Sequence, residues 1–208
     1  MDGYKLKLQA NYRIMKDSLL VGVVLYGMMI FLMSCHSRQH SALCPNKEEL
    51  NQLRTGDLVF CIGQSTKSDL VRIASSKEAV FSHVGFVVVK DGDAKMVHMS
   101  ADADVITCEP FSSYATTSNA SSLTFYRIKS LNTPYQLQVR LDSLLARKVP
   151  FDHHYDFHNS EKLYCTELIV KSLKAVGCEV FKHSVSNKYI YPDDLLKISG
   201  LEFLFSIK

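Results

Sequence analysis

Cys165 is the residue whose type and surroundings most favour covalent chemistry in this sequence. It stands in the run Tyr164-Cys165-Thr166-Glu167-Leu168, where a polar stretch gives way to apolar residues at helical spacing. The thiolate is the nucleophilic form of cysteine, and both a helix N-terminus and a neighbouring imidazole favour it. The pattern therefore predicts a nucleophile at the start of a helix, whose free backbone N–H groups could also bind an oxyanion.

Two of the eight histidines, His83 and His98, are best placed to serve this thiol. His83 lies at the start of a β-branched run over 82–89, and His98 lies in the run over 95–100, which the turn at 90–93 should pair with the first. Histidines on adjacent strands can project to one face, so that one imidazole takes the thiol proton and the other orients it.

Each of these residues also has a purely structural interpretation. A cysteine in an apolar helix is usually part of the core, and a histidine at a strand start is usually a half-buried side chain. A zinc site built from Cys165, His83 and His98 is a further alternative, although no CxxC or HxxxH pair supports it. Spacing alone leaves the function open, and we expect neither a metal ion nor a cofactor.

Apolar periodicity predicts the elements that must position these residues. They are helices at 48–53 and 68–74, strands at 58–62, 82–89, 95–100, 105–106 and 123–128, and two amphipathic helices that begin near Pro134 and Cys165. A Ser/Thr-rich loop is expected at 112–122, and Gly177 should end the helix of Cys165. Strands followed by helices predict an α+β fold, with an antiparallel sheet or partial barrel packed against helices.

The N-terminal segment has the pattern of an export signal. Four basic residues precede an uncharged apolar run of about 15 residues over 19–33, which is shorter than the roughly 20 that a membrane span needs. The run closes on Cys35 and resembles a bacterial lipoprotein signal, which implies lipidation of Cys35; an uncleaved anchor helix is the alternative. Either interpretation predicts a protein of the bacterial cell envelope, anchored to a membrane outside the cytoplasm.

The composition is that of one modest globular domain. The chain has 208 residues, of which 47% are hydrophobic, and a formal net charge of +3. Without the basic N-terminal segment the rest is nearly neutral, so we expect no nucleic-acid partner. We divide the chain into a signal segment (1–34), a tether (35–47) and a catalytic domain (48–208). The five cysteines beyond Cys35 show no disulfide framework.

Several segments resemble the circularly permuted NlpC-type papain-like cysteine hydrolases, particularly the YiiX/YebB-like branch, with lecithin retinol acyltransferases as distant relatives. They are Thr55-Gly56-Asp57-Leu58-Val59-Phe60, the helix over 68–76, Ser82-His83-Val84-Gly85-Phe86, Tyr164-Cys165-Thr166-Glu167-Leu168 and Tyr191-Pro192-Asp193-Asp194-Leu195. As in the permuted branch, the histidine precedes the cysteine. The resemblance implies a permuted papain-like fold with Cys165 as nucleophile and His83 as base.

The resemblance also assigns the remaining positions. His98 would orient the imidazole of His83, at a position where the branch often has Glu. Tyr164 could line an acyl pocket, or it could be structural. We expect specificity to come from the loops at 112–122 and 153–162.

The expected activity is that of a membrane-tethered cysteine hydrolase that cleaves an amide or ester bond through an acyl-enzyme. Its substrate would be a peptidoglycan peptide or a lipid-linked acyl group. A lipid acyltransferase or thioesterase that uses the same site is one alternative. A non-catalytic peptide- or lipid-binding protein is another.

Overall fold

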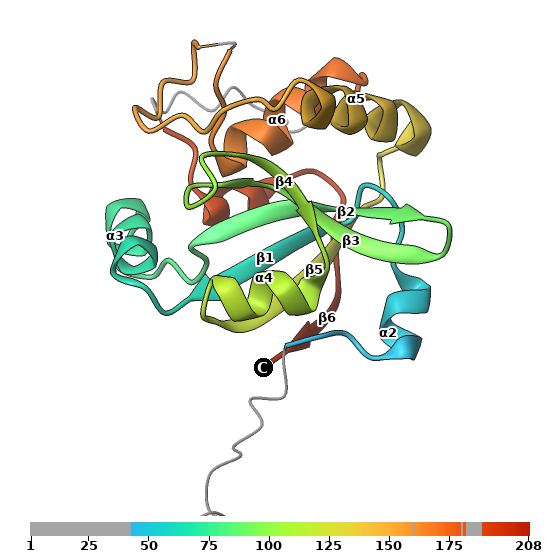
Figure 1. The fold of residues 1–208 in the computed structure, drawn as a ribbon, viewed down its shortest axis with the longest axis horizontal. Helices are drawn as coiled ribbons and strands as arrows, with labels where there is room; N and C mark the ends of the chain where they lie inside the picture. Colours follow the sequence, from blue (N-terminus) through green and yellow to red (C-terminus); the bar gives the residue numbers. More distant parts are fainter. Residues whose placement is uncertain (1–42, 160, 180, 182–188) are drawn as a thin grey trace, which may run out of the picture. The chain divides into compact units, whose positions relative to one another are not determined.

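The computed structural model describes residues 43–159, 161–179, 181 and 189–208 (Figure 1). These residues belong to one compact unit over 41–208. The expected signal segment, Cys35 and most of the tether lie outside the described residues, so they stay predictions. Within the described part, no helix has both the length and the apolar character that crossing a membrane requires.

A six-stranded antiparallel sheet forms the centre of the domain. Its strands are β1 (Leu58–Gly63), β2 (His83–Lys90), β3 (Asp93–Ser100), β4 (Val105–Glu109), β5 (Ala120–Ile128) and β6 (Leu201–Ile207), in the order β4-β3-β2-β1-β5-β6. The predicted hairpin of β2 and β3 is confirmed, and Asp91 and Gly92 make its turn with φ angles of 53° and 84°. Two successive positive φ angles suit the right-handed twist of paired strands.

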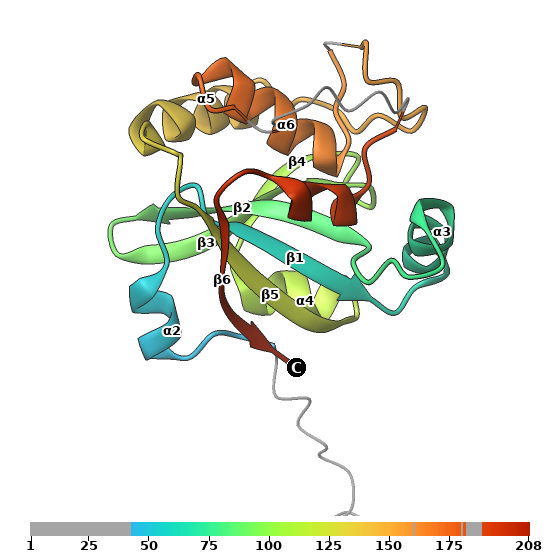
Figure 2. The ribbon, with the colours of Figure 1, turned by 180° about the vertical axis from the view of Figure 1, so that it is seen from behind.

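Helices cover both faces of this sheet (Figures 1 and 2). The long helices α5 (Pro134–Ala146) and α6 (Cys165–Ala175) pack on one face, and α4 (Phe111–Thr117) packs on the other. β2 therefore buries alternate residues on opposite faces, which explains why its sequence is almost continuously apolar. The predicted α+β class with helices packed on an antiparallel sheet is confirmed.

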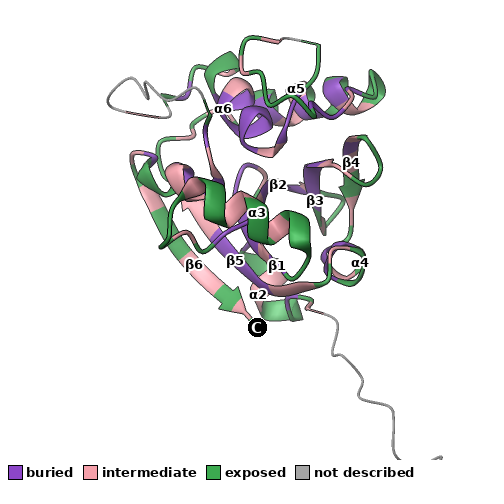
Figure 3. Cartoon of the chain, turned by 90° about the vertical axis from the view of Figure 1, so that its left-hand side faces the viewer, coloured by how far each residue is buried: buried purple, intermediate pink, exposed green. Residues whose placement is uncertain are grey.

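Three short helices complete the fold. α2 (Lys47–Gln52) begins at a capping box, in which Glu49 N–H donates to Asn46 Oδ1 at 2.9 Å and Asn46 N–H donates to Glu49 Oε2 at 2.7 Å. α3 (Thr66–Ser75) connects β1 to β2 and buries none of its residues (Figure 3). The 3-10 helix η1 (Pro192–Lys197) precedes β6.

The expected loop at 112–122 is wrong, because α4 occupies most of it and β5 begins at Ala120. Phe111, Tyr114 and Ala115 are buried at helical spacing, which supplies the apolar stripe that a surface helix needs. Hydroxyl groups of the Ser/Thr-rich stretch donate to carbonyl groups of the same helix, as Thr116 Oγ1 does to Ser112 O at 2.9 Å. These bonds use the groups that would otherwise compete with the helix.

Candidate active site

The structure places Cys165 at the first position of α6, as predicted. Its thiol is half-buried, and the backbone N–H groups of Cys165, Thr166 and Val84 point to its sulfur. Two of these groups belong to the free N-terminus of the helix, and the third belongs to β2. Val84 directly follows His83, so the nucleophile meets the strand of its expected base.

His83 and His98 also lie together, as predicted. His83 Nε2 is 3.0 Å from His98 Nδ1, and the two rings meet edge to face with centroids 5.1 Å apart. The second nitrogen of His98, Nε2, lies 2.9 Å from Glu109 Oε1. In the described part of the chain no hydrogen bond joins the thiol of Cys165 to His83, and such contacts are often long in ligand-free sites.

The surroundings of Cys165 and His83 favour the uncharged form of both side chains in the ligand-free site. Burial raises the pKa of the Cys165 thiol to about 11, and the three backbone N–H groups only partly offset it. Burial, followed by the neighbouring His98, holds the pKa of His83 well below its usual 6.5. The N–H groups at the start of α6 favour the thiolate, as expected, but burial outweighs them, so the thiol is uncharged at rest and would lose its proton during an attack on a substrate.

This state of the thiol predicts the pH dependence of its alkylation. With a pKa of about 11, the thiolate fraction of Cys165 rises tenfold with each pH unit below that value. We expect the rate of Cys165 alkylation by iodoacetamide to climb steadily between about pH 6 and pH 9, as followed by site-resolved mass spectrometry. The exposed Cys44 reports on the probe in the same samples. A rate already at its plateau near pH 6 would indicate a thiolate–imidazolium pair and would contradict the raised pKa of the Cys165 thiol.

Two residues of the His83 motif, Ser82 and Gly85, help to position β2 and β3. Ser82 Oγ accepts a hydrogen bond from Gly63 N–H at 2.9 Å, which ties the start of β2 to the end of β1. A Cβ on Gly85 would lie 2.9 Å from Val97 O and 3.0 Å from His98 Cβ. Glycine at this position therefore lets β3 approach closely enough for His98 to reach His83.

The segment ahead of His83 is fixed by Asp193 in η1. The two carboxylate oxygens of Asp193 accept hydrogen bonds from Val80 N–H at 2.9 Å and Phe81 N–H at 3.0 Å. This explains why an acidic residue stands in the Tyr191–Leu195 motif. The Asp193 carboxylate joins η1 to the segment that leads into β2, the strand of His83.

The polar residues next to Cys165 hold the start of α6. Glu167 Oε2 accepts from Tyr164 N–H at 3.1 Å, and its other oxygen pairs with Lys171 Nζ at 2.8 Å. Thr166 Oγ1 donates to Ile190 O at 2.6 Å, while Ile190 N–H donates to the hydroxyl oxygen of Tyr164 at 3.5 Å. Tyr164 is buried, and these contacts are structural. Its role in substrate binding stays a prediction.

Two residues of the site, Glu109 and Tyr114, were missed by the sequence analysis. The Tyr114 ring stacks on His83 with centroids 5.7 Å apart and meets the edge of His98 at 5.0 Å. Glu109 could not be found from the expected strand at 105–106, because its place follows from the register of β4, in which Thr107 pairs with His98 and Glu109 is the next residue on that face. The apolar stripe of α4 could have revealed Tyr114.

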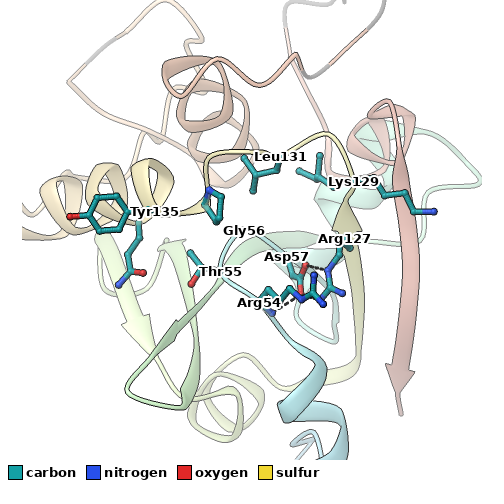
Figure 4. A pocket seen from close by; sticks show the side chains of 11 residues that line it. Arg54, Thr55, Gly56, Asp57, Arg127, Lys129, Leu131 and Tyr135 are labelled. Atoms are coloured by element: carbon teal, nitrogen blue, oxygen red, sulfur yellow. Dashed lines mark hydrogen bonds and ion pairs between the residues drawn. The ribbon is translucent and has the colours of Figure 1, made fainter.

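A groove of about 450 Å³ lies away from these residues, next to the start of β1 (Figure 4). Its lining includes Arg54, Asp57, Arg127, Lys129 and Tyr135. The Asp57 carboxylate forms an ion pair with Arg127, whose Nε and Nη2 donate hydrogen bonds to it at 2.8 Å and 2.7 Å. None of the residues expected to be catalytic lines this groove.

The zinc alternative finds no ligand set in the part of the chain that the structure describes. No group of three or more His, Cys, Asp or Glu residues there is placed to hold a metal ion.

Comparison with known proteins places these features in a family. The model of the permuted papain-like amidase enzymes, YaeF/YiiX, C92 family, matches residues 52–206. Among solved structures, the chain is similar to the metalloprotein YiiX from Escherichia coli O157:H7 at a TM-score of 0.61 and 16% sequence identity. The match covers 74% of this chain and 97% of that one, and at this identity it supports the fold alone. No curated protein matches the chain.

Proposed function

The chain belongs to the YaeF/YiiX, C92 family of permuted papain-like amidases and is a cysteine hydrolase; from this premise we propose that Cys165 attacks the carbonyl carbon of an amide bond with His83 as general base. The observation that carries the proposal is the meeting of two elements. The thiol at the start of α6 lies against the N–H of Val84, the residue after His83. The nucleophile and the base thus come from adjoining points of the fold.

The reaction follows from this placement. His83 Nδ1 takes the thiol proton while the sulfur bonds to the carbonyl carbon, and N–H groups at the start of α6 stabilise the oxyanion. The C–N bond then breaks, and the proton on His83 passes to the leaving nitrogen. A water molecule next gives a proton to His83 and attacks the thioester, which releases the acid and returns the proton to the sulfur.

For the substrate we propose an amide bond of a peptidoglycan peptide. The amidase family supports an amide bond as the bond that is cleaved, and the export-type N-terminal segment supports a substrate in the bacterial cell envelope. The lipid on Cys35, or an uncleaved anchor helix, would tether the enzyme to the membrane there. The near-neutral catalytic domain gives no electrostatic support for a nucleic-acid partner.

An exposed apolar row supports a second candidate, an ester or thioester of a lipid-linked acyl group. Leu70 and Ile73 of α3 are 61% and 74% exposed, and Val80 in the segment that follows is 46% exposed. These three apolar side chains precede His83 in the chain and offer exposed surface for an acyl chain. The enzyme would then be a thioesterase if water accepts the acyl group, or an acyltransferase if a lipid or an amine does.

Trapping of the acyl-enzyme tests the proposal. The full chain is mixed with peptidoglycan-type peptide amides or with acyl esters and thioesters, quenched in acid and mapped by mass spectrometry. We expect an acyl adduct on Cys165 and free acid from the amides, and no adduct on the exposed Cys108. An adduct from the esters alone favours the second candidate, and an acylated acceptor indicates transfer. If the protein binds one of these compounds but forms no adduct and releases no product, hydrolysis is contradicted and the alternative of a non-catalytic binding protein stands.

A further inference from the structure

We propose that Glu109 is a positioning residue that fixes the tautomers of His98 and His83, and so keeps Nδ1 of His83 free to take the Cys165 proton. This inference rests on the proposed function of His83 as the base. It extends the pair expected from the sequence to a row of three side chains on three neighbouring elements, His83 on β2, His98 on β3 and Glu109 on β4.

The direction of the hydrogen bonds follows from the acceptor at the end of the row. An ionised carboxylate only accepts, so His98 Nε2, at 2.9 Å from Glu109 Oε1, must carry the hydrogen. Neutral imidazole has one N–H, and His98 Nδ1 is therefore an acceptor. His83 Nε2, at 3.0 Å from that atom, must then donate. Nδ1 of His83 is then left without a hydrogen and without a partner in this row, which is the state that a general base requires.

The surroundings keep Glu109 ionised. Hydrogen bonds from His98 and Ser113 lower the pKa of Glu109 although burial opposes them. Its side chain is 17% exposed and that of His98 only 4%. The other titratable groups around the two imidazoles are Tyr114 on α4, Cys61 on β1 and Cys165 on α6. Among the described ion pairs, Glu109 has no partner except His98.

The row also provides for the charge that forms during the attack. When His83 Nδ1 gains the thiol proton, its Nε2 proton can shift to His98 Nδ1, which moves the positive charge next to the Glu109 carboxylate. A positive charge in a buried site costs less free energy when an ionised carboxylate lies beside it than when no opposite charge is near. The carboxylate therefore helps the base through His98 without touching the substrate.

The tautomers can be measured directly in the unaltered protein. Two-bond ¹H–¹⁵N correlations of the ¹⁵N-labelled full chain, assigned with His83→Gln and His98→Gln, should show both residues with hydrogen on Nε2. A parent protein with hydrogen on Nδ1 of His83 would overturn the proposal. This measurement requires no folded Glu109 variant and no known substrate.

Glu109→Gln tests the consequence for catalysis. A glutamine amide has both an acceptor oxygen and a donor NH₂ group, so it no longer forces hydrogen onto His98 Nε2. Where it donates, both bonds reverse and His83 carries its hydrogen on Nδ1. We expect this tautomer to appear in the spectrum beside the parental one, and acylation by p-nitrophenyl acetate to fall with the parental fraction that is lost, up to the loss of about 10²-fold that follows from a missing general base. The control Glu202→Gln, at an exposed carboxylate of β6, should keep the parent rate.

The outcomes separate this proposal from the proposed function. Parental tautomers and a parental rate in Glu109→Gln would overturn the role of Glu109 while acylation of Cys165 stands. Absence of any acyl-enzyme in the parent would contradict the proposed function, whereas the spectra would still decide whether Glu109 fixes the tautomers.

Discussion

Cys165→Ala is expected to lower the hydrolysis of p-nitrophenyl acetate by at least about 10³-fold, because it removes the thiol that we propose forms the acyl-enzyme. The stability of the fold should hardly change, since the Cys165 side chain is small and half-buried and its sulfur contacts N–H groups at a helix end. Changes at such positions usually stay within about 1 kcal/mol. Release of p-nitrophenolate gives the rate, and a thermal melt gives the stability.

The matched controls for Cys165→Ala are the two exposed cysteines, Cys44 and Cys108. Replacement of either by alanine should leave the rate at the parental value. Comparable hydrolysis by Cys165→Ala and the parent would remove Cys165 from the mechanism. A collapse of the melting temperature would instead show that the thiol supports the start of α6.

Asp57→Ala is expected to cost about 3 kcal/mol of folding free energy, near the lower end for breaking a buried ion pair. Asp57 is 2% exposed and accepts both a two-pronged bond from Arg127 and a bond from Arg54 N–H at 2.8 Å. The Arg127 side chain is 21% exposed, so water can solvate part of its positive charge when Asp57 is removed. The value follows from urea unfolding, and a loss of about 3 kcal/mol lowers the melting temperature by roughly 6–12 °C.

The exposed pair of Lys129 and Glu202 is the control for Asp57→Ala. With side chains 63% and 46% exposed, this pair contributes little, and Glu202→Gln should shift the stability by less than about 0.5 kcal/mol. The folded Asp57→Ala protein should still be acylated at Cys165, because Asp57 lies toward the opposite end of β1 from the His83 pairing. An unchanged stability would show that water replaces the Asp57 carboxylate as the partner of Arg127 and of Arg54 N–H without net cost.

The places of Cys165, His83 and His98 in the fold could be predicted from the sequence because their evidence is local. Period-two and period-3.6 patterns depend on neighbouring residues, so β2, β3, α5 and α6 were foreseen. The pKa of Cys165 could not be foreseen in the same way. A helix N-terminus is visible in the sequence, but the burial that outweighs it depends on how α6 packs against β2.

The role of Glu109 was hidden for a related reason. Its contact with His98 follows from the register of β4 on β3, which pairs His98 with Thr107. That register could not be deduced from the two residues first recognised as strand, Val105 and Ile106. The Ser/Thr composition of α4 concealed the helix whose Tyr114 packs on both imidazoles, because hydroxyl-bearing residues are typical of loops.

The bond from Val80 N–H to Asp193 spans 113 positions of the chain. During synthesis from the N-terminus, the ribosome releases His83 first, Cys165 much later and Asp193 last of the three. Until Asp193 docks, the segment that leads into His83 lacks this anchor. The surroundings of His83 are therefore complete only when nearly the whole chain has been made.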